Sequence, residues 1–152
     1  MKKIPLTKGA VALVDDADFE RVSRHSWSLA IRGTAVARID HRTVTMHRFL
    51  LDLPSGVLCD HKNRNPLDNR RENLRPATDF QNAWNQGLHR DSKTGLKGVC
   101  WASRNQRYRA TIVANKKQHH LGYFSNAVDA ACAYNVAAKK HFGEFACVNR
   151  MD

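Results

Sequence analysis

The sequence predicts an α+β protein in which two regions each combine short antiparallel strands with one helix. In the first region, an apolar strand at 57–59 and a second short strand at 74–77 flank a loop rich in Asn, Asp and Pro, and a helix-capping signal follows. In the second region, three alternating segments precede a long alanine-rich segment with helical spacing. A chain of 152 residues is long enough for two small domains. We therefore expect domains at residues 1–88 and 98–152, joined by a linker at 89–97.

The segments before the first apolar run predict a small α+β layer. Residues 3–14 alternate apolar and polar side chains around a Lys-Gly turn, as two short strands do. The acidic run at 15–18 supplies a capping residue and first-turn acids for a short helix. Residues 35–46 predict a second hairpin, and 49–53 a short helix that ends before Pro-Ser-Gly. We expect this layer to cover the segment that follows.

An acid and an imidazole, Asp60 and His61, come directly after the apolar strand at 57–59. Carboxamides follow at Asn69, Asn73 and Asn82. Such a set can hold one hard divalent cation through oxygen atoms and place a neutral imidazole beside it. With an ordinary pKa of about 6.5, the imidazole can take a proton from water at physiological pH. This is the minimum equipment for cutting a phosphodiester.

Two local signals bear on whether these side chains can meet. Adjacent residues of a strand point to opposite faces, so Asp60 and His61 serve one site only if the extended conformation breaks at Lys62. A Thr-x-x-Gln capping box begins at Thr78 and predicts a helix that starts there. Asn82 then falls in the first turns of this helix. The expected arrangement is two strands and a helix with a metal ion between them.

The charge distribution favours a nucleic-acid partner. Lys and Arg number 25 against 14 Asp and Glu, a net charge of +11, and residues 89–124 hold eight of the bases with the single acid Asp91.

The sequence contains no apolar run of the length of a membrane span or a signal peptide. We therefore expect a cytoplasmic protein without membrane contacts.

The second region predicts three strands, at 98–102, 108–113 and 117–124, and then a helix capped by Ser125. In the second strand, alternation puts Tyr, Ala and Ile on one face and Arg109 and a threonine on the other, with Arg107, which directly precedes the strand, on that second face too. The small apolar positions of the helix recur at three and four residues, so the helix can lie close to a sheet. We expect a three-stranded antiparallel sheet packed on one C-terminal helix, with its other face basic.

About a third of the chain resembles the HNH endonucleases of the phage and intron-encoded homing type. The resemblance rests on Met46-His47-Arg48, Asp60-His61, the Asp-Asn-Arg-Arg-Glu-Asn-Leu run at 68–74, and Gln81-Asn82. It implies a ββα-metal fold in which Asp60 and Asn82 ligate one Mg²⁺ or Mn²⁺ ion. It also implies that His61 is the general base and that Asn73 steadies the His61 region.

The last metal ligand is Asn82 where other HNH enzymes have His, which favours a hard, oxygen-preferring cation over zinc. Two interpretations of His47 stay open. It can contact a phosphate beside the site, or it can pack as an ordinary helix residue.

Residues 94–149 resemble the plant ethylene-response-factor (Apetala-type) DNA-binding domain. Gly98-Val99, Tyr108-Arg109-Ala110 and the alanine-rich helix carry much of the match. The resemblance implies that the uncovered sheet face enters the DNA major groove. Cys100, Ala102, Gln118 and His120 stand where the plant domains place Arg and Trp, so a plant-type target is not implied. The candidate contacts are Trp101, Arg104, Arg107, Arg109, Thr111, Lys116 and Lys117. The alternative is a solvated basic face.

These observations predict a metal-dependent HNH endonuclease, homing-type and encoded by a bacterial host or a phage. Its C-terminal module directs it to double-stranded DNA. A lone HNH site cuts one strand, so a monomer would nick and a homodimer could break both strands. The main alternative is a catalytically inactive DNA-binding transcriptional regulator. A structural zinc module does not fit the spacing of the candidate ligands.

Overall fold

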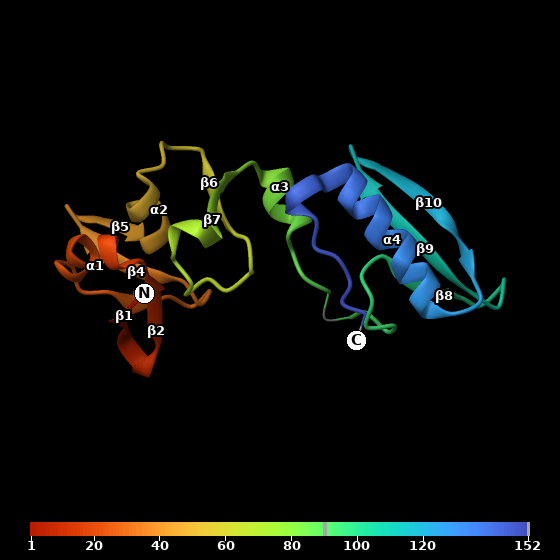
Figure 1. Cartoon of the computed structure of the whole chain (residues 1–152), viewed down its shortest axis with the longest axis horizontal. Helices are drawn as coiled ribbons and strands as arrows, with labels where there is room; N and C mark the ends of the chain where they lie inside the picture. Colours follow the sequence, from red (N-terminus) through yellow and green to blue (C-terminus); the bar gives the residue numbers. More distant parts are fainter. Residues whose placement is uncertain (90, 152) are drawn as a thin grey trace. The chain divides into compact units, whose positions relative to one another are not determined.

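A computed structural model describes residues 1–89 and 91–151 (Figure 1). The chain divides into two compact units, Met1–Asn82 and the part that begins at Ala83. The division falls within helix α3 (Asp79–Trp84), earlier in the chain than the linker expected at 89–97. Arg90 of that linker and Asp152 at the end of the second expected domain lie outside the described residues. In the described part of the chain, no helix has the length and apolar character needed to cross a membrane.

The first unit opens with a hairpin, a helix, a small sheet and a second helix. The elements are β1 (Lys2–Pro5), η1 (Thr7–Gly9), β2 (Val11–Val14), α1 (Asp16–Ser23), β3 (Ser28–Leu29), β4 (Ala35–Ile39), β5 (Arg42–Thr45) and α2 (Met46–Leu51). Strands β1 and β2 pair antiparallel, and β4 lies between β3 and β5. The expected hairpins and both short helices are confirmed, because alternation and turn residues encode them locally.

A single apolar core holds this layer together. Val14, Val22, Met46 and Leu50 are completely buried, so β2, α1 and α2 all contribute to it. The indole of Trp27 closes one side, and its Nε1 donates a 2.9 Å hydrogen bond to the carbonyl of Val22. Burial of side chains of this size contributes about 1.5–3 kcal/mol each. The core therefore stabilises the layer that precedes the segment with the candidate site.

The segment with the candidate site forms a two-stranded sheet and a short helix. Strand β6 (Leu58–His61) pairs antiparallel with β7 (Leu74–Ala77), with Asp60 opposite Arg75. Helix α3 follows, and its capping box forms as expected: Thr78 N donates to Gln81 Oε1 at 2.9 Å, and Gln81 N donates to Thr78 Oγ1 at 3.3 Å. The strand runs through His61, two residues beyond the expected apolar run at 57–59.

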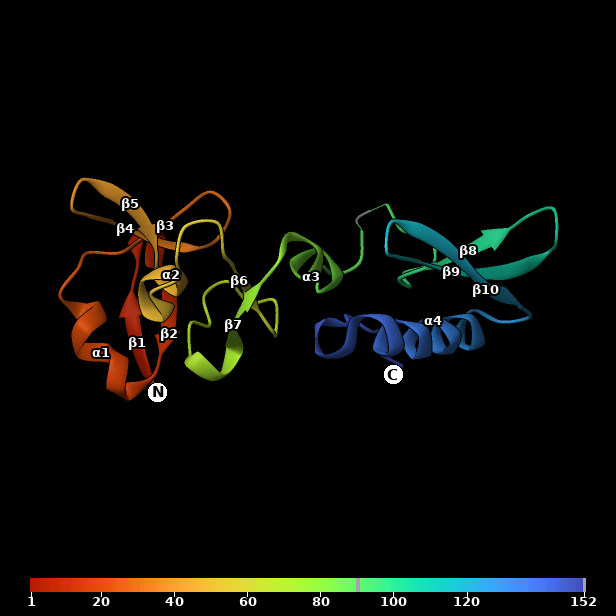
Figure 2. The same cartoon turned by 90° about the horizontal axis from the view of Figure 1, so that it is seen from above.

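The second unit is a three-stranded antiparallel sheet with one helix along it. Strand β9 (Arg107–Ala114) lies between β8 (Val99–Ala102) and β10 (Lys117–Phe124), and α4 (Ala127–Phe142) packs on one face (Figure 2). The helix is capped by Asn126, not by the expected Ser125, because the Asn126 side chain reaches the backbone N–H of Asp129 at 2.8 Å.

Candidate active site

Asp60, the expected metal ligand, is buried against an arginine of the neighbouring strand. Arg75 lies directly opposite it in the β6–β7 register, so both side chains are on the same face of the sheet. Arg75 Nε and Nη2 lie 2.8 and 2.6 Å from Oδ2 of Asp60. The exposed fractions are 4% for Asp60 and 7% for Arg75. Two charge-assisted hydrogen bonds therefore hold the carboxylate in a site that water hardly reaches.

His61, the expected general base, lies next along β6 and is also buried, with 9% exposure. Its Nε2 lies 3.4 Å from Oδ1 of Asn69. Burial lowers the pKa of His61 below its ordinary value, although the Asn69 contact and the charges of Asp60 and Asp68 oppose this effect. Because an amide oxygen only accepts hydrogen bonds, the contact assigns the ring proton to Nε2 and makes Nδ1 the proton acceptor. The imidazole is therefore neutral, and the Asn69 contact orients its ring.

Asp60 and His61 are the last two residues of β6, and a turn begins at Lys62, so the extended conformation breaks where the sequence required. Their side chains start from opposite faces of β6. Asp60 turns toward Arg75, and His61 turns toward Asn69. Because the two side chains leave β6 on opposite faces, a substrate that contacts both Asp60 and His61 must lie across the end of the strand.

His47 lies beside the candidate base. Its ring and that of His61 meet edge to face, with centroids 5.2 Å apart. Thr45 Oγ1 lies 2.9 Å from Nε2 of His47. Burial, followed by the charges of His61 and Arg48, lowers the pKa of His47 to about 4. His47 is therefore neutral at physiological pH, and it approaches a phosphate only as a hydrogen-bonding group.

Asn73 holds the two ends of the loop that follows β6. Its Oδ1 accepts a 2.9 Å hydrogen bond from the backbone N–H of Asn63, and its Nδ2 donates to the carbonyl of Asp68 at 2.7 Å. Its own carbonyl accepts from the N–H of Lys62 at 2.8 Å. The amide that touches His61 is that of Asn69, and Asn73 acts on the loop that carries Asn69.

The N-terminal layer fixes this loop from outside. Asn69 is completely buried, and its N–H donates to the carbonyl of Leu13 in β2 at 2.8 Å. Arg71 Nε and Nη2 each lie 2.7 Å from a carboxylate oxygen of Asp18 in α1, and Arg71 N donates to Asp15 Oδ2 at 2.8 Å. Sequence reasoning missed these partners, since the acids at 15–18 also fit helix capping. Asp15 makes no side-chain capping bond here.

A second carboxylate in the loop has its own arginine. Asp68 is 2% exposed, and both of its oxygens accept hydrogen bonds from Arg70, at 2.8 Å each. Asn63 Nδ2 adds a third bond at 2.7 Å. The hydrogen bond from the Arg70 guanidinium is the main cause that lowers the pKa of Asp68. Asp68 is therefore an ionised structural group rather than a proton donor.

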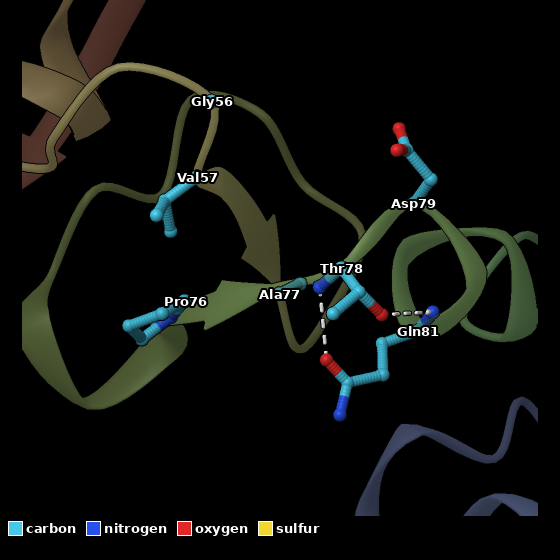
Figure 3. A pocket seen from close by; sticks show the side chains of 7 residues that line it. All are labelled: Gly56, Val57, Pro76, Ala77, Thr78, Asp79 and Gln81. Carbon is cyan, nitrogen blue, oxygen red and sulfur yellow. Dashed lines mark hydrogen bonds between the residues drawn. The ribbon is translucent and has the colours of Figure 1, made fainter.

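Asn82, the second expected ligand, lies half-buried in the first turn of α3, and its N–H donates to the carbonyl of Thr78 at 3.0 Å. A hollow of about 360 Å³ opens where β7 passes into α3 (Figure 3). It is lined by Gly56, Val57, Pro76, Ala77, Thr78, Asp79 and Gln81. The capping box between Thr78 and Gln81 forms part of its wall (Figure 3).

The donor set suits a hard cation. Among the described residues, no three His, Cys, Asp or Glu side chains are grouped as a metal cage would need. One carboxylate and one carboxamide, from Asp60 and Asn82, suit Mg²⁺ or Mn²⁺, because such ions keep several waters and use substrate phosphates as further ligands. The chemistry of these two side chains therefore suits such an ion, while in the structure the Asp60 carboxylate is hydrogen-bonded to Arg75.

The candidate DNA contacts of the second unit do not all share one surface. Arg107 and Arg109 are exposed on the face of β9 opposite Ala110 and Ile112, which pack toward α4. Thr111 shares the arginine face. Arg104 lies in the turn between β8 and β9, and Lys116 and Lys117 lie at the turn into β10.

Trp101 is placed differently. It pairs with Tyr108 across the β8–β9 ladder, with ring centroids 4.9 Å apart, so its backbone position belongs to the α4 side. Two residues absent from the candidate contacts lie toward the arginine face: His120 pairs with Thr111, and Tyr123 pairs with Arg109. A bulge between His120 and Gly122 shifts the register of β10 against β9. Counting alternate residues in the sequence does not reveal this shift.

Comparison with known proteins agrees with the arrangement around β6, β7 and α3. Residues 49–84 match a family described as HNH endonuclease. A protein of Acanthamoeba polyphaga mimivirus described as an uncharacterized HNH endonuclease is 34% identical over 151 residues, which cover 95% of this chain and 78% of that protein. Protein 3.8 of Escherichia phage T7 is 33% identical over 94 residues, covering 62% of this chain and 77% of that protein. No solved structure matches the chain.

The matched segment contains Asp60, His61, Asn73 and Asn82, and the mimivirus relative extends over nearly all of the chain. HNH nucleases generally depend on a divalent metal ion, for which the carboxylate and carboxamide oxygens are suitable ligands. This chain belongs to the HNH endonuclease family and is a nuclease.

Proposed function

We propose that this nuclease cuts one strand of double-stranded DNA, with His61 as general base and a single Mg²⁺ or Mn²⁺ ion held by Asp60 and Asn82. The observation that carries the proposal is the state of His61. Burial keeps its imidazole neutral, and Asn69 orients it, directly beside Asp60 in the chain. A neutral, oriented imidazole next to an oxygen ligand is what metal-assisted hydrolysis of a phosphodiester requires.

His61 takes a proton from the attacking water through Nδ1. Positioned general bases typically contribute about 10² to 10⁴ in rate. Asn69 accepts a hydrogen bond from the other ring nitrogen, which keeps that nitrogen protonated. Asn73 serves the base indirectly, because it closes the loop that carries Asn69.

Asp60 and Asn82 supply the oxygen ligands from β6 and α3, which β7 connects along the chain. A cation bound there would stabilise the extra negative charge on the phosphate and on the leaving alkoxide. His47 lies beside His61 and is suited to hydrogen-bond a phosphate oxygen while remaining neutral.

The second unit would deliver the nuclease to DNA in the manner of the Apetala-type domains that its sequence resembles. Residues 98–124 contain five Lys or Arg and no acid. The outer face of β9 presents Arg107 and Arg109, with Thr111 between them and the turn to β10. Lys116 and Arg104 in the adjoining turns extend the positive surface. Cations arranged in this way bind the phosphate backbone and position a protein on the duplex.

Nicking of supercoiled plasmid tests the proposal. The wild-type chain should convert it to open circles with Mg²⁺ and not with EDTA, and His61→Ala should abolish nicking while DNA affinity stays nearly unchanged. His89→Ala removes an exposed histidine of the second unit and is the matched control. Normal nicking by His61→Ala, or nicking by the wild type in EDTA, would refute the proposed mechanism.

A further inference from the structure

We propose that Arg75 couples metal binding to DNA binding. In the protein without DNA, its guanidinium forms an ion pair with the carboxylate of Asp60 and keeps the affinity of Asp60 for a divalent cation low. A DNA phosphate then supplies the negative charge that lets the cation bind. The inference rests on the proposed function, because it assumes that Asp60 is a metal ligand.

The geometry of the pair is the first argument. Arg75 Nε and Nη2 both contact Oδ2 of Asp60, at 2.8 and 2.6 Å, and the two residues face each other across β6 and β7. Both side chains are at least nine-tenths buried. A cation that binds Asp60 must approach within a few ångströms of a guanidinium that water barely screens. The two positive charges therefore compete for one carboxylate.

The charge balance around His61 is the second argument. The carboxylates whose charges act on His61 are Asp60 and Asp68. Asp60 is paired with Arg75, and Asp68 is paired with Arg70, which also forms an ion pair with the exposed Glu72. Asp60, the expected ligand, and its arginine therefore add no net negative charge with which to attract a divalent cation. An approaching phosphate brings such a charge, and guanidinium groups bind phosphate in the same two-pronged way as carboxylate.

The coupling has a measurable size. A unit charge within about 4–6 Å shifts the ionisation of a neighbouring group by about 1–3 pKa units, which corresponds to a factor of about ten or more in affinity. We therefore expect Arg75→Gln to bind Mn²⁺ in the absence of DNA about tenfold more tightly than the wild type. Arg38→Gln, which removes an exposed arginine from β4 of the same unit, should leave the Mn²⁺ affinity unchanged.

The direct measurement is a titration of the full chain with Mn²⁺ alone, in which electron paramagnetic resonance reports the free and bound ion. Unfolding curves with and without Mn²⁺ accompany it, because the loss of Arg75 removes charge-assisted hydrogen bonds from a buried carboxylate. Mn²⁺ should raise the Tm of Arg75→Gln more than that of the wild type. An Arg75→Gln protein that folds but binds Mn²⁺ no more tightly than the wild type would overturn the inference.

A second measurement leaves Arg75 intact. In a His61→Ala background, which keeps the DNA whole, a short duplex should tighten Mn²⁺ binding about tenfold or more. By linkage, Mn²⁺ should tighten duplex binding by the same factor. The Asp60→Asn, His61→Ala protein with the same duplex measures the Mn²⁺ held by DNA itself. Equal Mn²⁺ affinity with and without duplex, in a chain whose wild type nicks with Mg²⁺, would overturn the coupling alone. Absence of nicking by the wild type would instead overturn the proposed function.

Discussion

Arg71 and Asp18 join the loop that follows β6 to the N-terminal layer: the guanidinium Nε and Nη2 each lie 2.7 Å from a carboxylate oxygen. Asp18 is 5% exposed, so hydrogen bonds from Arg71 replace most of the hydration that its carboxylate loses on burial. The backbone of the same loop is bound to Leu13 of β2 on both sides of Asp68. Residues outside the matched segment 49–84 therefore hold the loop that presents Asn69 to His61.

Loss of this pair should weaken both the fold and the reaction. Asp18→Asn removes the charge from a buried, doubly hydrogen-bonded partner, and we expect it to lower the free energy of unfolding by about 1–2 kcal/mol, because Arg71 is partly exposed. The turnover rate of nicking should fall, since the support of Asn69 is looser. Urea denaturation and plasmid nicking measure the two effects.

The matched control for this pair is the exposed ion pair between Arg24 and Glu20, one helical turn apart in α1. Glu20→Gln should change stability by less than about 0.5 kcal/mol. If Asp18→Asn were as mild as Glu20→Gln and left nicking untouched, the loop would not depend on the N-terminal layer.

Much of the secondary structure was predictable because its signals are local. The capping box at Thr78 and Gln81 forms as the sequence indicates, and the hairpins follow the alternation of apolar residues. Even local signals compete, however. Ser125 and Asn126 are both good helix caps. The helix begins after Asn126 because that residue has the extended backbone conformation of an N-cap and its side chain accepts the hydrogen bond from Asp129 N.

The partners of the candidate site were less predictable, since they depend on contacts between distant segments. The loop offers Asn69 and Asn73 as similar amides, and the bond from Asn69 N to the Leu13 carbonyl fixes which of them faces His61. The pairing of Asp60 with Arg75 follows from the β6–β7 register. A sequence predicts that two strands pair more readily than it predicts which residues face each other.

The two buried histidines should make the protein acid-sensitive. Burial lowers the pKa of both His61 and His47, to about 4 for His47, so the unfolded chain binds more protons than the folded one between pH of about 6.5 and 4. Stability is therefore fully present above pH of about 6.5 and is lost as the pH falls. His47 alone would account for about 3 kcal/mol at the acid end of this window.

Replacement of His47 by Gln should flatten this dependence. Urea denaturation at pH 7 and pH 4.5 compares the two proteins, and the difference in unfolding free energy between the two pH values should be smaller for the variant. His41→Gln changes an exposed histidine of the β4–β5 turn and should behave as the wild type does. An equally steep loss of stability in His47→Gln would show that His47 takes up its proton without cost to the fold.

The basic sheet face makes a prediction about salt. Arg107 and Arg109 project from β9 away from α4, and replacement of both by Ala should weaken duplex binding and lower the slope of log affinity against log salt by up to about 2. Lys139 and Lys140 are exposed on α4, so their double replacement removes the same charge from another element. A larger change of slope from the lysine pair would assign the DNA surface to the helix.

Gly98 should be the most sensitive glycine of the second unit. Its φ of +74° lies in the left-handed region, and an added Cβ would overlap the ring of Tyr134 and approach the carbonyl of Thr111. Because Tyr134 of α4 is buried in the core with Ile112 and Ala114 of β9, the ring has little room to move. Gly98→Ala should therefore lower the free energy of unfolding by about 2–4 kcal/mol, more than backbone strain alone would.

Gly95→Ala is the control that measures backbone strain without a steric clash. Gly95 has a φ of +69° with open space around it, so this change should lower the free energy of unfolding by about 1 kcal/mol. Thermal unfolding of the two variants measures the difference, and equal costs would show that the sheet and helix adjust to the added methyl group.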